Sequence, residues 1–190
     1  MTIKSLDIIH DEHRALAAML SGLRSIASGI EAGRLKPDYD LLESMIEYID
    51  KVPEKVHHPK EDQYLFAKLR QRCAEALPVI ERLETEHRQG DARMATLRDA
   101  LASYRQQGDA GFQGYHEALK TYIEQEWKHM NTEEREVFPL AKAHLTAEDW
   151  AEIDAAFLSN QNPWEGAAGE YRALFSKIVN IAPAPVGLGG

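Results

Sequence analysis

Apolar residues recur every three or four positions along most of the chain, and no segment alternates between apolar and polar residues as a half-buried strand would. This pattern predicts amphipathic helices almost throughout. The clearest case is the first helix, which should fade between positions 29 and 33, where two glycines occur. Its inward-facing seam consists of Leu6, Ile9, His13, Leu16, Leu20 and Leu23.

Three more long helices follow by the same reasoning. The second should run from about 38 to 72, with interruptions at Pro53 and Pro59, because proline lacks the backbone N–H that a helix interior uses. The third should begin near Pro78 and continue through Tyr104, and the fourth should cover about 112–143. Long helices joined by short connections favour an all-α, up-down-up-down four-helix bundle. We expect residues 1–145 to form this bundle.

A short helical extension is predicted after the bundle, over residues 146–181. The segment Thr146-Ala-Glu-Asp149 resembles a capping box that opens a helix through about position 158. A polar loop at 160–169, another helix at 170–180 and a flexible tail at 182–190 should follow. The extension is expected to pack on the bundle or to form a homodimer contact, because it is rich in aromatic residues. These are Trp150, Phe157, Trp164, Tyr171 and Phe175.

Histidines occupy seam positions where the pattern predicts leucine, at His13 in the first helix and at His87 in the third. A buried imidazole needs a hydrogen-bond partner or a metal ion, because an unsatisfied buried polar group costs about 1–3 kcal/mol. Each seam histidine is followed some forty residues later by His-x-x-x-Glu, whose spacing stacks both side chains on one helical face. These pairs are His57 with Glu61 and His129 with Glu133. The repeat therefore predicts one shared metal site built from both copies.

This doubled layout resembles the hemerythrin-like, or HHE cation-binding, family over about residues 6 to 145. The resemblance implies a four-helix bundle that encloses two non-haem irons, bridged by two carboxylates and an oxo or hydroxo group. Carried over by residue, His13, His57, His87 and His129 would be terminal ligands, and Glu61 and Glu133 would be the bridges. Mixed imidazole and carboxylate donors suit iron, manganese or zinc, and the resemblance favours two iron ions.

The chain departs from the pattern of the oxygen-carrying hemerythrins at the third helix, where Asp91 stands four residues after His87 in place of a second histidine. His10 and His58 are the possible additional metal ligands. His58 would need a local distortion, because it lies about 100° around the helix from its neighbour His57. Three acidic residues are weaker candidates, with hydrogen-bonding roles around the ligands favoured for them. They are Glu84, Asp91 and Glu126.

Composition narrows the classes of function. The 190 residues suffice for one sizeable core, and the single cysteine excludes an internal disulfide. A formal net charge of −9 opposes binding to nucleic acids and to anionic membranes. No apolar stretch has the length of a signal peptide core or a membrane helix, so a cytoplasmic protein is expected.

The favoured interpretation is a non-enzymatic di-iron protein that binds or senses dioxygen, or reports nitric oxide or iron status. One alternative is an enzyme on the same scaffold, acting in peroxide or nitric oxide turnover, ferroxidase chemistry or iron–sulfur repair. Another is a structural or partner-binding bundle. The role of tyrosines such as Tyr122 is expected to be packing rather than chemistry.

Overall fold

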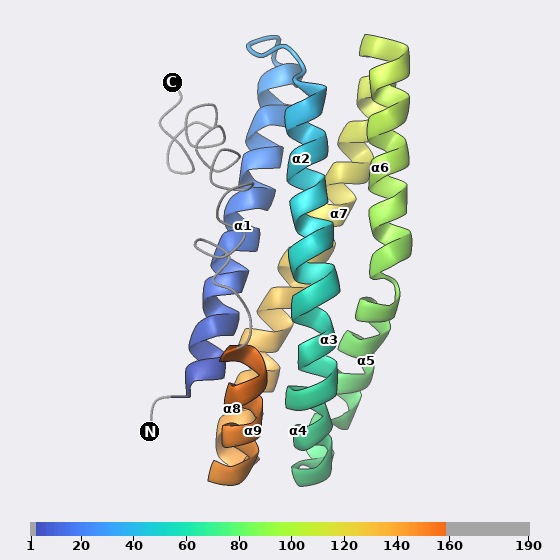
Figure 1. Ribbon diagram of the computed structural model, residues 1–190. Coiled ribbons are helices and arrows are strands. Elements are labelled where there is room, and N and C mark those ends of the chain that lie inside the picture. Colours follow the sequence, from blue (N-terminus) through green and yellow to red (C-terminus); the bar gives the residue numbers. More distant parts are fainter. Residues whose placement is uncertain (1–2, 159–190) are drawn as a thin grey trace.

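The structure, a computed structural model, describes residues 3–158. Four long helical rods run side by side, and successive rods are joined at alternate ends of the molecule (Figure 1). The first rod is α1 (Lys4–Glu31). The second contains α2 (Tyr39–Ile49), a π-helical stretch (Asp50–His57), α3 (His58–Lys60), a second π-helical stretch (Glu61–Phe66) and α4 (Ala67–Arg72). Gly33, at φ 68°, lies in the turn between these two rods.

The third rod contains α5 (Leu77–Arg88) and α6 (Gly90–Gln107), preceded by a 3-10 turn (Ala74–Ala76). After a 3-10 turn (Gly108–Gly111), the fourth rod contains α7 (Phe112–Thr132), a π-helical stretch (Glu133–Val137) and α8 (Phe138–His144). A shorter helix, α9 (Ala147–Leu158), follows. Residues 3–158 contain no strand, so the prediction of an all-α helical bundle is confirmed.

The predicted interruptions of the second helix are present as π-helical stretches: Pro53 lies inside the first, and Pro59 lies in α3 between the two. The rod continues through both prolines, because the wide π-helical turns accommodate residues that lack a backbone N–H. One detail differs from the sequence prediction. The third rod, by contrast, is not one uninterrupted helix. It is divided at Gln89, immediately before Gly90, where glycine weakens the helix. The carbonyl oxygen of Glu86 there accepts a hydrogen bond of 3.1 Å from Nη2 of Arg93.

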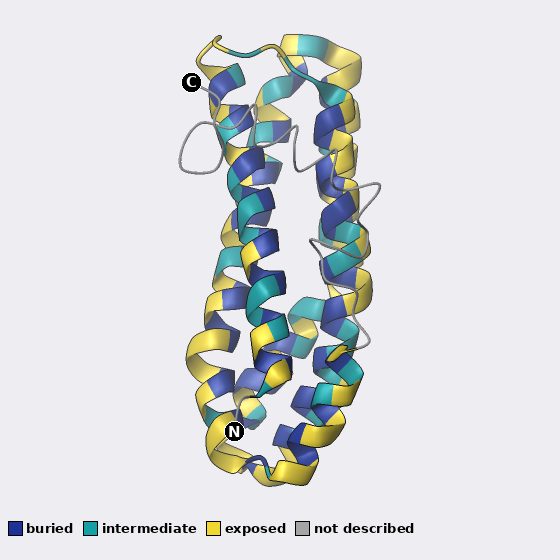
Figure 2. Ribbon diagram, turned by 60° about the vertical axis from the view of Figure 1, so that its left-hand side comes forward, coloured by how far each residue is buried: buried dark blue, intermediate teal, exposed yellow. Residues whose placement is uncertain are grey.

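Buried residues follow the length of all four rods (Figure 2). Their side chains form two apolar clusters, with a layer of buried polar residues between them. One cluster lies towards the end of the bundle that joins α1 to α2, and contains residues such as Leu20 and Tyr104. The other lies towards α9, and contains residues such as Leu6 and Phe66. Each rod therefore contributes apolar residues above and below the polar layer. This arrangement surrounds the polar side chains with a dry, close-packed interior.

Helix α9 packs against the lower end of α1 through Trp150, Ile153 and Phe157, all of which are buried. The predicted capping box is present: the backbone N–H of Thr146 donates to Asp149 Oδ2 at 3.0 Å, and the backbone N–H of Asp149 donates to Thr146 Oγ1 at 3.2 Å.

Asp154 of α9 also accepts a hydrogen bond of 2.8 Å from the backbone N–H of Ser5, at the beginning of α1. The predicted loop at 160–169, helix at 170–180 and tail at 182–190 lie outside the described residues, as do Trp164, Tyr171 and Phe175. The proposed homodimer contact depends on that segment and stays a prediction. Within residues 3–158, no helix has the length and apolar character needed to cross a membrane.

Candidate metal centre

The six residues predicted as ligands lie together in the polar layer. Two groups of four can each direct one donor atom towards a common point, with the donor atoms within 4.8 Å of one another. One group contains His13, His57, Glu61 and Glu133. The other contains His87, His129, Glu61 and Glu133. The two glutamates belong to both groups, so the donors form two adjacent sites that share two carboxylates.

All four rods contribute to this cluster. His13 comes from α1, His57 and Glu61 from the second rod, His87 from α5, and His129 with Glu133 from the fourth. The side chains of Glu61 and Glu133 are fully buried, and none of the four histidine side chains is more than 5% exposed. Isolated charges are not tolerated at such depth. The cluster must therefore hold protons or cations that balance its carboxylates.

Every one of the four histidines donates a hydrogen bond from Nδ1 to a carboxylate outside the cluster. His13 donates to Glu134 at 2.9 Å, and His57 donates to Glu12 at 2.6 Å. In the second copy of the repeat, His87 donates to Asp62 at 2.7 Å and His129 donates to Glu86 at 2.8 Å. Such carboxylate–histidine pairs are typical of metal sites, because they fix the tautomer and the orientation of the ligating ring. In each ring, Nε2 is left for the interior.

The inward-facing atoms fit a metal better than they fit one another. Nε2 of His13, Nε2 of His57 and all four carboxylate oxygens of Glu61 and Glu133 are buried without a hydrogen-bond partner among the described residues. Nε2 of His13 is 3.2 Å from Oε2 of Glu133, yet no hydrogen bond is formed. Nε2 of His87 and Nε2 of His129 are 3.0 Å apart. Since both rings donate from Nδ1, two neutral imidazoles would face each other with bare lone pairs at this distance, so a proton or a metal ion must lie between them.

The pKa values of the histidines depend on two opposing effects, burial and the neighbouring carboxylates. Burial opposes the charged form of His57, but Glu61 and Glu12 outweigh it and hold its pKa well above the usual value. Burial is likewise outweighed at His87, where the carboxylates of Asp62 and Glu133 raise the pKa to about 9. Without a metal, protons balance the buried carboxylates. Metal binding would release these protons, since only neutral imidazole is a ligand.

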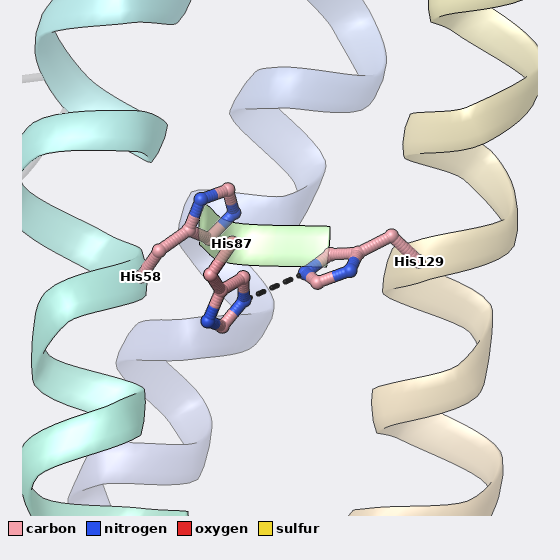
Figure 3. A group of neighbouring side chains, drawn as sticks. All are labelled: His58, His87 and His129. Carbon is pink, nitrogen blue, oxygen red and sulfur yellow. Dashed lines mark hydrogen bonds between the residues drawn. The ribbon is translucent and has the colours of Figure 1, made fainter. Parts of the chain in front are cut away.

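His58 points into the second group, where its ring lies against the rings of His87 and His129 (Figure 3). Its side chain is 4% exposed, and the three imidazoles form a further group of potential donors. The distortion that the sequence demanded is provided by the π-helical turns on either side of α3. Burial and the neighbouring histidines His87 and His129 lower the pKa of His58 well below its usual value, so this ring is neutral.

The remaining candidates from the sequence lie elsewhere. His10 is 40% exposed and contacts Glu134 at 3.3 Å, outside the donor groups. Glu84 pairs with Arg70 at 2.5 Å, and Asp91 pairs with Lys55 on the surface.

Glu126 is fully buried, and its Oε1 lies 3.4 Å from Nη1 of Arg93. It belongs to none of the groups of potential donors among residues 3–158. Its placement supports a role beside the ligands rather than among them.

Phenylalanine rings cover the centre on the side of α9. Phe138 stacks on His13, with ring centroids 6.2 Å apart, and Phe66 stacks on His87 at 5.7 Å. Phe157 of α9 meets His57 edge-on at 6.5 Å. These contacts cover one side of three of the four imidazoles and hold the rings in place.

The carboxylates that orient the histidines were not identified from the sequence, although a signal for them was present. Each adjoins a predicted ligand, and each has a counterpart at the repeat distance. Glu12 precedes His13 as Glu86 precedes His87, and Asp62 follows Glu61 as Glu134 follows Glu133. The repeat thus extends beyond the ligands to the groups that support them. Glu54, which contacts His58, also has a counterpart, since it precedes His57 by three residues as Glu126 precedes His129.

Comparison with known proteins agrees with this geometry. A search of curated proteins and a search of solved structures each returned no match. A family model, the hemerythrin HHE cation binding domain, matches residues 4–141, which include the whole donor cluster but not α9. Because the match spans well over half of the chain, this protein belongs to the hemerythrin HHE cation-binding family.

Proposed function

We propose that this protein holds two iron ions in the shared centre and reversibly binds dioxygen, or reports dioxygen, nitric oxide or iron status. The observation that carries the proposal is the sharing of Glu61 and Glu133 between the two donor groups. A carboxylate that serves both groups brings two ions close together. Imidazole and carboxylate donors without thiolates suit iron among the common metals.

The residues have distinct roles in this proposal. His13 and His57 hold one ion, His87 and His129 hold the other, and His58 is the fifth imidazole, on the side of the second ion. Iron at such a site supplies electrons and an open position for a small diatomic molecule. The protein orients the imidazoles through their carboxylate partners. Phe66, Phe138 and Phe157 exclude water from the cluster.

Anaerobic purification followed by metal analysis and oxygen titration tests the proposal. Two irons per chain and an absorption band between the near-ultraviolet and the green that responds to oxygen would support it. Rapid catalytic loss of peroxide or nitric oxide would instead assign an enzyme. Zinc, or a metal-free protein whose melting temperature iron does not change, would favour a structural bundle and contradict the proposal.

A further inference from the structure

A second set of polar side chains lies next to the His58 side of the centre. It consists of the buried residues Glu54, Tyr122 and Glu126 and the partly buried Arg93, whose side chain is 14% exposed. The hydroxyl of Tyr122 donates to Oε1 of Glu54 at 3.2 Å, and Nδ1 of His58 donates to Oε2 of the same carboxylate at 3.2 Å. A chain of hydrogen bonds therefore connects Tyr122 to an imidazole of the centre.

Glycine at position 90 makes room for this arrangement. A Cβ atom there would overlap the carboxylate of Glu54, so no other residue fits without displacing it. Gly90 is buried in the seam of the third rod, where an apolar side chain would otherwise fill the core. At this point the core lacks an apolar side chain, and the carboxylate of Glu54 occupies the space instead.

The other two residues of the set, Arg93 and Glu126, have buried polar atoms without a hydrogen-bond partner among residues 3–158. Neither oxygen of the fully buried Glu126 accepts a hydrogen bond from residues 3–158, although Nη1 of Arg93 lies 3.4 Å from Oε1. Nε of Arg93 is likewise buried without an acceptor among those residues. Unsatisfied groups at such depth are costly, and in proteins they are usually satisfied by a buried water or a ligand.

A surface pocket leads to this set from outside. It lies between α6 and α7 and has a volume of about 340 Å³. Arg93 and Tyr122 line the pocket, and on their other side they contact Glu126 and Glu54 respectively. The rest of the wall combines apolar surface, from Leu97 and Ala118, with the polar residues Thr96, Thr121 and Gln125. Arg93 and Tyr122 therefore lie between the pocket and the two buried carboxylates of the set.

The charges and the unsatisfied atoms define what the set accepts. Glu54 and Glu126 oppose an anion, because only one guanidinium faces them. A metal ion does not fit either, since no group of three metal-binding atoms converges there among the described residues and Arg93 would repel it. The oxygens of Glu126 require a hydrogen-bond donor, whereas Nε of Arg93 requires an acceptor. A small uncharged molecule with O–H groups provides both.

We propose that Glu54, Arg93, Tyr122 and Glu126 form a hydrated chamber that binds water or hydrogen peroxide, and that the pocket between α6 and α7 is its entrance. Small hydrogen-bonding molecules reach the His58–His87–His129 side of the centre through this chamber. Apolar dioxygen does not depend on it. Access of these molecules to a metal ion rests on the proposed function, but the binding of water in the chamber does not.

A high-resolution crystal structure of the full chain without added metal tests the chamber by itself. An ordered water within hydrogen-bond distance of both Glu126 and Nε of Arg93 is expected. The Glu126→Leu variant should lose that water, while Glu124→Leu, on the exposed face of α7, should retain it. Direct pairing of Arg93 with Glu126, with no water between them, would overturn the proposal whether or not the protein binds iron.

The entrance is tested by filling it. Thr121→Trp places a large ring in the pocket, and Ala102→Trp does so in a separate pocket between α2 and α6. In the ferrous-loaded protein, Thr121→Trp should slow oxidation by hydrogen peroxide at least about fivefold and leave oxidation by dioxygen unchanged. Ala102→Trp should alter neither rate. Equal effects on both oxidants, or no effect on peroxide, would overturn the assignment of the entrance.

Discussion

The two halves of the centre are built from two copies of one repeat, yet their surroundings differ. His13 and His57 have the same carboxylate-supported geometry as His87 and His129. Among residues 3–158, an aromatic ring of α9 meets an imidazole of the first half alone, through Phe157 and His57. In the same part of the chain, the second half alone has an additional imidazole, His58, which contacts Glu54 of the polar set. The repeated residues provide the donors, and the residues without a counterpart make the two halves of the centre inequivalent.

Approach from solvent differs in the same way. A pocket of about 260 Å³ lies beside His13, with Trp127 and Met130 in its wall, so the first half is reached past large apolar side chains. In the entrance proposed above, the second half is reached past Arg93 and Tyr122, which line the pocket between α6 and α7. An internal repeat can therefore form a symmetric ligand cage and still give its two sides different access.

The largest effect is expected where the halves are joined. Glu133→Ala removes a carboxylate that both donor groups use, so both irons should be lost while most of the helicity is retained. Metal analysis and circular dichroism measure the two quantities. Glu136→Ala, an exposed change one turn away, is the matched control and should keep both irons. Two tightly bound irons in Glu133→Ala would reject the bridging assignment.

Loss of a terminal imidazole should act on one half alone. His57→Ala should release the ion held with His13, because a single imidazole is then left on that side. His58→Ala should matter less, because His87 and His129 still hold their ion. Titration of the two variants with ferrous iron compares them. Equal losses would place His58 on a par with the other ligands and would contradict the ranking.

The carboxylates that orient the rings should give intermediate effects. Glu12→Gln and Glu86→Gln are equivalent changes in the two halves, and each should weaken iron binding by about 10- to 100-fold. The loss should be larger for Glu12, whose side chain is 5% exposed compared with 25% for Glu86, because solvent can replace the more exposed partner. Competition with a chelator measures both affinities. A larger loss for Glu86→Gln would show that burial does not set the difference.

The smallest effect concerns α9, which covers the first half only. Asp149 caps this helix and pairs with Arg72 at 2.9 Å, and hydrogen bonds from Arg72 lower the pKa of Asp149 to about 2. Asp149→Asn should reduce the free energy of unfolding by about 1 kcal/mol at neutral pH. The depressed pKa means that the native state holds the proton less tightly than the unfolded state does. The contribution of Asp149 is therefore present above the unfolded pKa, near 4.

This contribution should be lost as the pH falls from about 4 towards 2, so the native protein and the variant should converge there. Denaturant unfolding of the metal-free protein at several pH values measures the difference. Glu152→Gln, an exposed change on the same helix, serves as the control. A difference that does not depend on pH would contradict the role of the Asp149 charge.

Much of this architecture could be predicted because it depends on periodic signals. The 3–4 spacing of apolar residues predicted the rods, and histidines at seam positions indicated which imidazoles would be buried. The structure brings His13, His57, Glu61, His87, His129 and Glu133 together as the spacing suggested. The capping box at Thr146 could also be predicted, because it depends only on residues three positions apart.

What escaped prediction depends on local departures from regular helix. A straight α-helix turns His58 away from the cluster, and only the π-helical turns around it bring it in. Gly90 gave no signal of its own, since its importance lies in the space it leaves for Glu54. The third rod is divided at Gln89, directly before this glycine. His10 shares a helical face with His13, but its distance along α1 leaves it at the surface.

The proposed centre contains two ions that share Glu61 and Glu133. Anomalous diffraction at the iron edge, on crystals of the iron-loaded protein, would detect both ions. Two iron peaks are expected in the polar layer, one beside His13 and His57 and the other beside His87 and His129, with both glutamates between them. A single peak, or iron bound only at surface carboxylates, would rule out a shared dinuclear centre.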